Sequence, residues 1–328
     1  MIESENRKRG IKMRGKVNQY KPSGKSIKKR LYRDRFLYLL AVPSFLYLII
    51  NNYMPMVGLT LAFKNYSFAK GIFASKWCGL KNFTYLFGSK WAWIMFRNTI
   101  LYNLVFIFAG TAFSIFVAIL LNEIKRARLQ KIYQILILIP YLVSTVLIGY
   151  LVFAFFSDAN GFVNKSLIEP LGGKAVDWYL TPAAWPFILT FVQLWRSFGY
   201  QSIVFFATII GFDRALYEAA IMDGASPLQQ ITKLTLPLLK PTVIILVIMS
   251  LGRMFSTDFG LFYQVPQDTG MLYEVTTTID TFVYRALMTD HDIGRSLAAG
   301  FLQSVLGFAV VMVTNFIVRK AEPDNALF

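Results

Sequence analysis

The chain has little of what soluble enzymes use for chemistry. Its 328 residues include one cysteine, Cys78, and one histidine, His291. Such numbers exclude a disulfide framework, a Cys/His metal cluster and a Cys–His dyad, and we expect both to be ordinary loop residues. Charged residues make up only 16% of the chain, against about 25% in soluble domains. The sequence therefore lacks both a Cys/His metal cluster and the polar surface of a water-soluble protein.

Apolar residues dominate instead, at 55% of the chain with a mean hydropathy of +0.49. A membrane-spanning helix needs about 20 consecutive apolar residues. Six segments of this kind lie near residues 36–56, 98–121, 132–156, 184–210, 241–262 and 297–318. Proline and glycine inside them are tolerated in membrane helices. The sequence therefore predicts an all-α, polytopic membrane protein with six transmembrane helices.

Positive charge is concentrated ahead of the first apolar segment. The formal net charge is +16, and residues 1–35 hold 13 Lys and Arg against 3 Asp and Glu. A basic stretch next to a span favours a cytosolic tail near anionic lipid, whereas a nucleic-acid-binding protein needs a folded basic face. The first apolar segment also lacks a small-residue cleavage pattern at its end. We therefore expect no cleaved signal peptide and no nucleic-acid partner.

Flanking charges predict the side of the membrane that each connector occupies. Lys and Arg prevail in the link 122–131 and after the sixth segment, whereas acids prevail in 157–183 and 263–296. By the positive-inside rule, basic connectors are cytosolic, and six spans place both termini inside. The connector 63–97 is an exception, because it carries six Lys and Arg and no acid yet falls outside. Its tryptophans and other aromatic residues suit helices lying in the membrane interface.

The connector 211–240 has the most distinctive local pattern, and the span count makes it cytosolic. A short helix is predicted over Tyr217–Asp223. Ala219 and Ala220 leave a small surface on this helix, so another backbone can pack closely against it. Gly224 can take the left-handed conformation that ends a helix. The first half of the connector is therefore expected to be a short, exposed, acidic helix.

A second helix is predicted directly afterwards. Ser226 and Gln229 have the spacing of a capping box, and Pro227 fits the first turn of a helix. Pro237 and Pro241 are expected to break the chain before the fifth span. The sequence thus predicts a helix–turn–helix on the cytosolic face.

The spacing of residues in this connector resembles a known motif. Glu218-Ala219-Ala220 is followed after three residues by Gly224, after nine more by Leu234, and then by Leu236-Pro237. This resembles the EAA loop of ABC importer permeases, with Leu234 where isoleucine is usual. Other stretches, which together cover about residues 36–320, resemble the sugar-permease branch that includes maltose, glycerol-phosphate and alginate importers, and most of all the LplB-type polysaccharide permeases. They are Gly58–Tyr66, Gly79–Phe83, Arg97–Thr99, Asp258–Gln264 and Ile279–Tyr284.

The resemblance implies a type I ABC importer permease of MetI-like architecture in the bacterial cytoplasmic (inner) membrane. In that family two homologous permeases form a heterodimer, each EAA helix docks on one of two cytosolic ATPases, and an extracytoplasmic solute-binding lipoprotein delivers an oligosaccharide. The resemblance also implies a non-catalytic subunit without a cofactor, with ATP and Mg bound by the partner ATPase. The coupling residues that it implies are Glu218, Ala219, Ala220, Asp223, Gly224 and Pro237.

The expected organisation follows from these assignments. Residues 1–35 form a basic cytosolic tail, 36–320 form the transmembrane permease domain, and 321–328 form a short cytosolic tail. The coupling loop 211–240 lies inside the permease domain.

Polar residues within apolar spans are the first candidates for a solute path. In the fourth span Gln193, Arg196 and Tyr200 recur at helical spacing on one face, with Ser197 and Gln201 beside them. Such side chains offer the hydrogen-bonding groups and aromatic faces that a sugar needs. They can equally hold neighbouring helices together.

The fifth and sixth spans add further candidates. Arg253 and Thr257 share a face, Asp258 is adjacent, and Gln303 and Ser304 lie about two turns into the sixth span. Two arginines inside the spans favour an acidic sugar, because guanidinium groups fit carboxylates. An internal Arg–Asp pair is the alternative, and the sequence leaves both interpretations open.

Two other function classes fit the sequence less well. A stand-alone secondary transporter is disfavoured by the EAA-like loop and by the lack of an obvious inverted repeat. An intramembrane enzyme would need a catalytic arrangement that the spans lack, and Glu218 and Asp223 point to different sides of a helix. Ser23–Ser26 ends like a P-loop, but Gln19 occupies the position of the required glycine. The energy for transport must therefore come from a partner.

Overall fold

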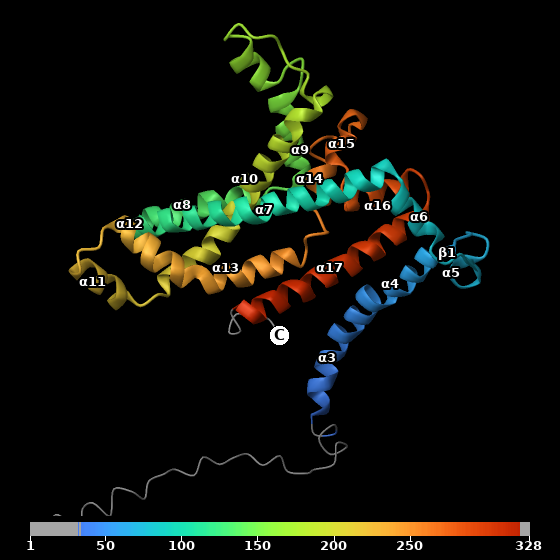
Figure 1. The fold of residues 1–328 in the computed structure, drawn as a ribbon, viewed down its shortest axis with the longest axis horizontal. Coiled ribbons are helices and arrows are strands. Elements are labelled where there is room, and N and C mark those ends of the chain that lie inside the picture. The colour runs from blue at the N-terminus through green and yellow to red at the C-terminus, as the bar shows by residue number, and fades with distance from the viewer. Residues whose placement is uncertain (1–31, 33, 322–328) are drawn as a thin grey trace, which may run out of the picture. The chain divides into compact units, whose positions relative to one another are not determined.

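The computed structural model describes residue 32 and residues 34–321. Almost all of the predicted C-terminal tail, 321–328, and of the predicted basic N-terminal tail, 1–35, lies outside these residues. The chain divides into two compact units between Val57 and Gly58. Helices dominate both units, as predicted from the apolar segments, and the strands found among the described residues form a single two-stranded sheet (Figure 1).

The first unit is one apolar helical stretch. It consists of α3 (Arg35–Leu48), the π-helical turn η1 (Ile49–Tyr53) and α4 (Met54–Met56), and helical structure continues into η2 (Val57–Phe63). None of the residues of α3, η1 or α4 is buried. The run Arg35–Phe63 is long and apolar enough to cross a membrane, so its exposed apolar side chains suit a lipid environment.

The second unit holds the remaining elements. They are β1 (Lys64–Asn65), α5 (Gly71–Ala74), β2 (Lys76–Trp77), α6 (Lys81–Gly88), α7 (Lys90–Glu123), α8 (Ala127–Leu142), α9 (Thr145–Phe156), η3 (Asn164–Ile168), η4 (Trp178–Leu180), η5 (Pro182–Ala184), α10 (Trp185–Ile210), α11 (Arg214–Met222), α12 (Pro227–Gln230), η6 (Ile231–Thr235), α13 (Leu236–Leu251), α14 (Phe259–Tyr263), η7 (Gly270–Leu272), α15 (Tyr273–Thr276), α16 (Ile279–Met288) and α17 (Ile293–Ala321). The strands pair antiparallel, with Lys64 opposite Trp77.

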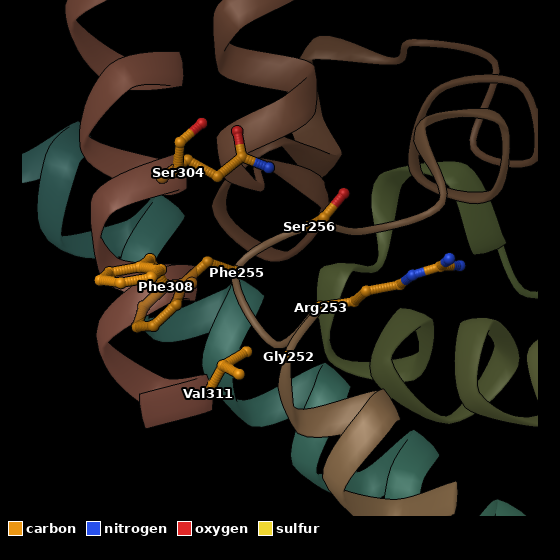
Figure 2. A pocket seen from close by; sticks show the side chains of 9 residues that line it. Gly252, Arg253, Phe255, Ser256, Ser304, Phe308 and Val311 are labelled. Atoms are coloured by element: carbon orange, nitrogen blue, oxygen red, sulfur yellow. The ribbon is translucent and has the colours of Figure 1, made fainter. Parts of the chain in front are cut away.

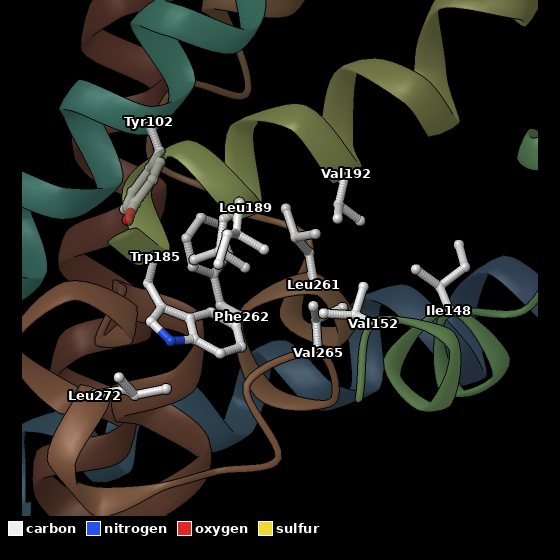
Figure 3. Packing of buried hydrophobic residues seen from close by; sticks show 11 residues of the cluster. Tyr102, Ile148, Val152, Trp185, Leu189, Val192, Leu261, Phe262, Val265 and Leu272 are labelled. Atoms are coloured by element: carbon white, nitrogen blue, oxygen red, sulfur yellow. The ribbon is translucent and has the colours of Figure 1, made fainter. Parts of the chain in front are cut away.

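Long helices form the body of this unit, with α10 packed against α7, α8 and α13, and α13 against α17. Figure 1 shows α11 and α12 at one end of these helices and α5 and α6 near the other. Three apolar clusters hold the helices together. The cluster in Figure 3 joins α10 to α9 and α14 and includes the fully buried Trp185 and Phe262. Burying aromatic side chains of this size dominates the energetics of such contacts.

The crossing of α8 and α10 depends on a glycine. A Cβ atom at Gly199 would lie 1.8 Å from the backbone oxygen of Ile137. No side chain fits at this separation, so the two backbones can approach only because residue 199 is glycine. The crossing therefore fixes where α10 passes α8.

Two predicted spans differ from the observed helices. The third, over 132–156, is not one continuous helix, because α8 and α9 are separated by a short break and meet at a bend of 92°. The fifth, over 241–262, was placed too far along the chain. Helical structure runs continuously over Pro227–Leu251 and then stops.

The prediction that Pro237 and Pro241 break the chain is therefore wrong. Pro237 lies in the first turn of α13, directly after the π-helical turn η6, where its missing N–H costs little.

By length and composition, four helical runs among the described residues can cross a membrane, or five if α8 and α9 form one span. The four are Arg35–Phe63, Lys90–Glu123, Pro227–Leu251 and Ile293–Lys320. The 26-residue α10 is not among them, and it carries the polar residues Gln193, Arg196 and Gln201. The sixth crossing stays a prediction, and α10 is the helix that would supply it.

Candidate functional site

The 211–240 loop begins with a well-capped helix. The Asp213 carboxylate accepts a hydrogen bond of 2.9 Å from the backbone N–H of Ala215, which caps α11 at its start. The helix ends at Met222, and the next glycine, Gly224, has a φ of 78°. The N–H of Ala225 returns to the carbonyl of the third residue of the EAA triplet, Ala220, at 2.9 Å. The predicted short helix and its glycine end are thus confirmed, although the helix begins three residues earlier.

The second helix of the loop is held to the first. The capping box between Ser226 and Gln229 is present, as predicted. Gln230 donates from Nε2 to the carbonyl of Ala225 at 3.1 Å. The hydroxyls of Tyr217 and Thr235 lie 3.0 Å apart, which ties α11 to η6. These contacts make the helix–turn–helix a defined structural unit.

Most of the coupling residues expected from the resemblance lie on α11 or directly after it, and Pro237 lies in the first turn of α13. Glu218, Ala219, Asp223, Gly224 and Pro237 are exposed, and Ala220 is half-buried. Sequence reasoning missed the apolar side chains that are exposed beside them. These are Leu216, Ile221, Met222 and Leu228, of which Met222 is 83% exposed. Their position could have been inferred from α11 being amphipathic, but their exposure depends on the helix having no covering element among the residues that the structure describes.

An apolar cluster joins this loop to the long helices. It brings together the ends of α7 and α10 and the start of α13 through Leu121, Phe205 and Leu239, among others. Phe212, just ahead of α11, packs against the same cluster, so the start of the loop is tied to the ends of both helices.

The second candidate region is the non-helical linker 252–258 between α13 and α14. Side chains from α7, α16 and α10 form hydrogen bonds to successive residues of this linker. Asn103 of α7 donates from Nδ2 to the carbonyls of Met254 and Ser256, at 2.8 and 3.2 Å. These bonds add to the backbone turn bonds of the linker, such as the one from the N–H of Ser256 to the carbonyl of Arg253 at 2.9 Å.

Asp280 of α16 provides the second set of contacts. One of its carboxylate oxygens accepts from the backbone N–H and the hydroxyl of Thr257, at 2.6 and 2.8 Å. The other accepts from Nε2 of Gln303 on α17 at 3.1 Å. Asp280 thus connects two predicted path residues. Sequence reasoning did not single it out, because no local pattern links a carboxylate to partners 23 residues away on either side.

Arg196 of α10 provides the third contact. Its guanidinium donates to the Asp258 carboxylate at 2.5 Å. The two side chains are 21% and 32% exposed, so the pair is largely shielded from water. Of the two interpretations that the sequence left open for these residues, the structure contains the internal Arg–Asp pair.

A cavity of about 390 Å³ lies between the linker and α17. Its polar lining groups come from Arg253, Ser256, Gln303 and Ser304, and its apolar lining includes Phe308. Figure 2 shows Val311 on α17 pointing to the linker at Gly252, whereas the Arg253 side chain extends away from α17. Arg253 is exposed and makes no ion pair with any described residue. The cavity is thus lined by neutral residues on its α17 side, and the exposed Arg253 lies at its edge.

The remaining predicted path residues lie elsewhere. Tyr200 stacks on Tyr141 of α8 with ring centroids 5.0 Å apart. The side-chain oxygen of Gln193 is buried and has no hydrogen-bond partner among the described residues. The structure therefore brings together Arg253 and Gln303 around one cavity, and Arg196, Thr257 and Asp258 around the linker. It does not bring Gln193 and Tyr200 to the cavity.

No group of three or more His, Cys, Asp or Glu side chains that could hold a metal ion occurs in the described part of the chain.

Comparison with known proteins identifies the family. The family "Binding-protein-dependent transport system inner membrane component" matches residues 110–323. The chain is 34% identical to Protein LplB of Bacillus subtilis over 90% of this chain and 92% of that protein. It is 32% identical to the polygalacturonan/rhamnogalacturonan transport system permease protein YteP of the same organism, over 89% and 90% of the two chains.

Solved structures agree with this assignment. A chain of a bacterial alginate ABC transporter, solved in complex with an alginate pentasaccharide-bound periplasmic protein, matches with a TM-score of 0.82 and 29% identity, over 90% of this chain and 98% of that one. The chain therefore belongs to the family of binding-protein-dependent transport system inner membrane components, the permease components of ABC importers.

Proposed function

We propose that this chain forms half of the translocation pathway for an acidic oligosaccharide and couples it to a cytosolic ATPase through α11. The observation that carries the coupling role is that α11 is a capped, exposed helix with uncovered apolar side chains at one end of the long helices. An apolar patch on a small helix suits insertion into a cleft of another protein. The EAA spacing supports the same assignment.

In this proposal the ATPase acts on α11 and the long helices respond. Closure of two ATPases would move α11, and the cluster of Leu121, Phe205 and Leu239 would pass the movement to α10 and α13. The spans would then change between inward- and outward-facing arrangements as rigid bodies. ATP and Mg would be bound by the partner, and the chain itself would hydrolyse nothing.

The solute class is inferred from the relatives and the linker cavity. YteP is named for polygalacturonan and rhamnogalacturonan transport, and the alginate transporter imports an acidic polysaccharide. The linker cavity offers neutral hydrogen-bonding groups, and the exposed Arg253 can bind a carboxylate. Together they support an acidic sugar chain that passes the 252–258 linker.

The proposed partners are a second homologous permease, two ATP-binding subunits and an extracytoplasmic solute-binding lipoprotein. The alginate transporter was solved with its sugar-loaded periplasmic protein, which supports the last of these. Both termini and the 211–240 loop would face the cytosol, as the flanking charges predict.

Gly224→Val tests the coupling role. Gly224 has φ 78° and open space around its Cα, so a β-branched residue would strain the end of α11 without a steric clash. In proteoliposomes containing the complete importer and its binding protein, we expect solute uptake per ATP hydrolysed to fall about tenfold or more, which corresponds to about 1.4 kcal/mol of lost coupling.

Gly172→Val is the matched control. Gly172 has φ 79°, is equally open, and lies in the connector 157–183, far from α11 in sequence. It should suffer the same backbone strain and keep normal coupling. Normal uptake per ATP in the Gly224 variant, with both variants inserted equally in the membrane, would refute the coupling role of α11.

A further inference from the structure

The connector 63–97 contains a small, internally fixed hairpin. Strands β1 and β2 pair antiparallel, and α5 lies between them. Lys64 donates from Nζ to the carbonyls of Ile72 and Phe73, at 3.0 and 3.1 Å, and so places a cation at the end of α5. The Ser75 hydroxyl bonds to the carbonyl of Gly71 at 2.6 Å and accepts from the N–H of Ser67. We call residues 64–81 the lysine–aromatic hairpin.

The basic residues of this connector fall into two groups. Lys64, Lys90 and Arg97 have partners within the protein. Lys90 pairs with Glu274 at 2.8 Å and lowers the pKa of that carboxyl, and Arg97 donates to the carbonyl of Glu274 at 3.1 Å. The second group is Lys70, Lys76 and Lys81, which are exposed and make no ion pair with any described residue. All three lie in the lysine–aromatic hairpin.

Large aromatic side chains of the same hairpin are also exposed. Phe73 on α5 is 83% exposed and Phe68 in the preceding turn is 78% exposed. Trp77 on β2 stacks on Phe63 with centroids 5.6 Å apart, but most of its surface is uncovered. Exposed aromatic rings next to lysines are the composition of a membrane interface, where the rings lie at the headgroup level and ammonium groups reach lipid phosphates.

The position of the hairpin in the chain also indicates that it lies at the membrane interface. The apolar helical run Arg35–Phe63 contains 29 residues and is long enough to cross the bilayer. The hairpin begins at the next residue, Lys64, so chain connectivity keeps it near the boundary of the hydrocarbon region. A compact hairpin at this place in the chain is therefore expected to lie at the level of the lipid headgroups.

We propose that the lysine–aromatic hairpin binds anionic lipid headgroups, with Phe68 and Phe73 entering the interface and Lys70, Lys76 and Lys81 facing lipid phosphate. Three lysines without an acidic residue in the connector are complementary to such lipids. The surface also accounts for the connector that violates the positive-inside rule, since half of its cations are used within the protein and the other half serve lipid. It does not depend on which solute is transported.

A fluorescent label on the hairpin tests the proposal. The sole cysteine is Cys78, so Cys78→Ser with Phe73→Cys allows one bimane label at position 73. The full chain is placed in phosphatidylcholine nanodiscs containing the same small fraction of either brominated phosphatidylglycerol or brominated phosphatidylcholine. We expect quenching by both lipids, with quenching by the anionic lipid favoured by about fivefold, the effect of one lysine near an anionic surface. High salt should reduce the preference.

Substitutions separate charge recognition from depth. Lys70→Gln, Lys76→Gln and Lys81→Gln together should abolish the preference and leave quenching by phosphatidylcholine. The control, Lys165→Gln with Lys174→Gln in the connector 157–183, should keep the preference. Equal quenching by the two lipids in the unmodified hairpin would overturn the anionic-lipid site. Absence of quenching by either lipid would overturn the interfacial position, and protection of the label by added solute-binding protein in that case would assign the surface to a protein partner.

Discussion

At the residue scale, Arg196 and Arg253 illustrate two different uses of a cation in an apolar protein. Arg196 is largely shielded and bound to Asp258, whereas Arg253 is exposed and makes no ion pair with any described residue. A shielded charge is tolerated because its partner compensates the lost hydration, and removal of one partner leaves the other uncompensated. An exposed cation stays hydrated, so its removal leaves no buried partner uncompensated. The two arginines should therefore respond differently to the same substitution.

We predict that Arg196→Ala and Asp258→Ala each lower the free energy of unfolding by about 2 kcal/mol, because each leaves one charge of a partly buried pair alone. The double variant should lose less than the sum, since both charges are gone. Denaturation of the purified chain in detergent measures all three values. Additive losses would show that the contact between these side chains contributes nothing to stability.

Arg253→Ala is the companion variant to this pair. It should leave the free energy of unfolding unchanged and raise the solute concentration for half-maximal uptake about tenfold, as expected for loss of one charge-assisted hydrogen bond. Uptake of an acidic and a neutral oligosaccharide by the reconstituted importer distinguishes the cause, because only the acidic solute should be affected. Equal uptake of the acidic solute before and after substitution would remove Arg253 from the path.

The sequence allowed part of this site to be predicted. Helical spacing identified Gln193, Arg196 and Tyr200 as one set, and the Arg–Asp pair was one of the two interpretations considered. The role of Asp280 was not predictable, because its partners Thr257 and Gln303 come from other elements and meet it only through the tertiary fold. The tertiary fold also determines which predicted path residues lie at the linker and which lie at the cavity.

At the scale of elements, α8 and α10 cross at Gly199 with their backbones in close approach. Here the Ile137 carbonyl occupies the space that a Cβ atom would need. A backbone atom in a helix cannot move aside as a flexible side chain can. The separation of α10 from α8 is therefore determined by the absence of one side chain.

We predict that Gly199→Ala lowers the free energy of unfolding by about 3 kcal/mol, the upper end of overpacking effects. Gly300→Ala in α17 is the control, because nothing lies within 4 Å of its Cβ position. There alanine should be neutral or raise stability by up to about 1 kcal/mol through helix propensity. Denaturant titrations of both variants provide the comparison, and equal stability of the two would mean that α8 and α10 separate at little cost.

Elements were predictable where local rules determine them. The capping box at Ser226 and the glycine end at Gly224 follow from side-chain chemistry over a few residues, and both are present. The bend between α8 and α9 was missed because the apolar pattern continues through it. The end of α13 at Leu251 was missed although Gly252 and Arg253 follow it, because polar residues are tolerated in a membrane span and hydrophobicity alone does not locate a helix end.

At the scale of the whole molecule, the number of crossings decides which side of the membrane α11 faces. Residues 157–183 follow the bent pair of α8 and α9, and residues 211–240 follow α10. If the bent pair and α10 each cross once, these two connectors lie on opposite sides of the bilayer. If both helical segments return to the side from which they came, the two connectors lie on the same side.

Cysteine accessibility measures this directly, since replacing Cys78 by serine removes the only native thiol. Leu171 is 86% exposed and Met222 is 83% exposed, so cysteine at either position should react readily. We expect a membrane-impermeant thiol reagent to label Leu171→Cys in spheroplasts, and Met222→Cys only after the membrane is opened. Labelling of both positions only in opened membranes would make the bent pair a re-entrant segment. Labelling of Met222→Cys from outside would separate α11 from any cytosolic ATPase, because an extracytoplasmic helix cannot receive force from ATP hydrolysis inside the cell.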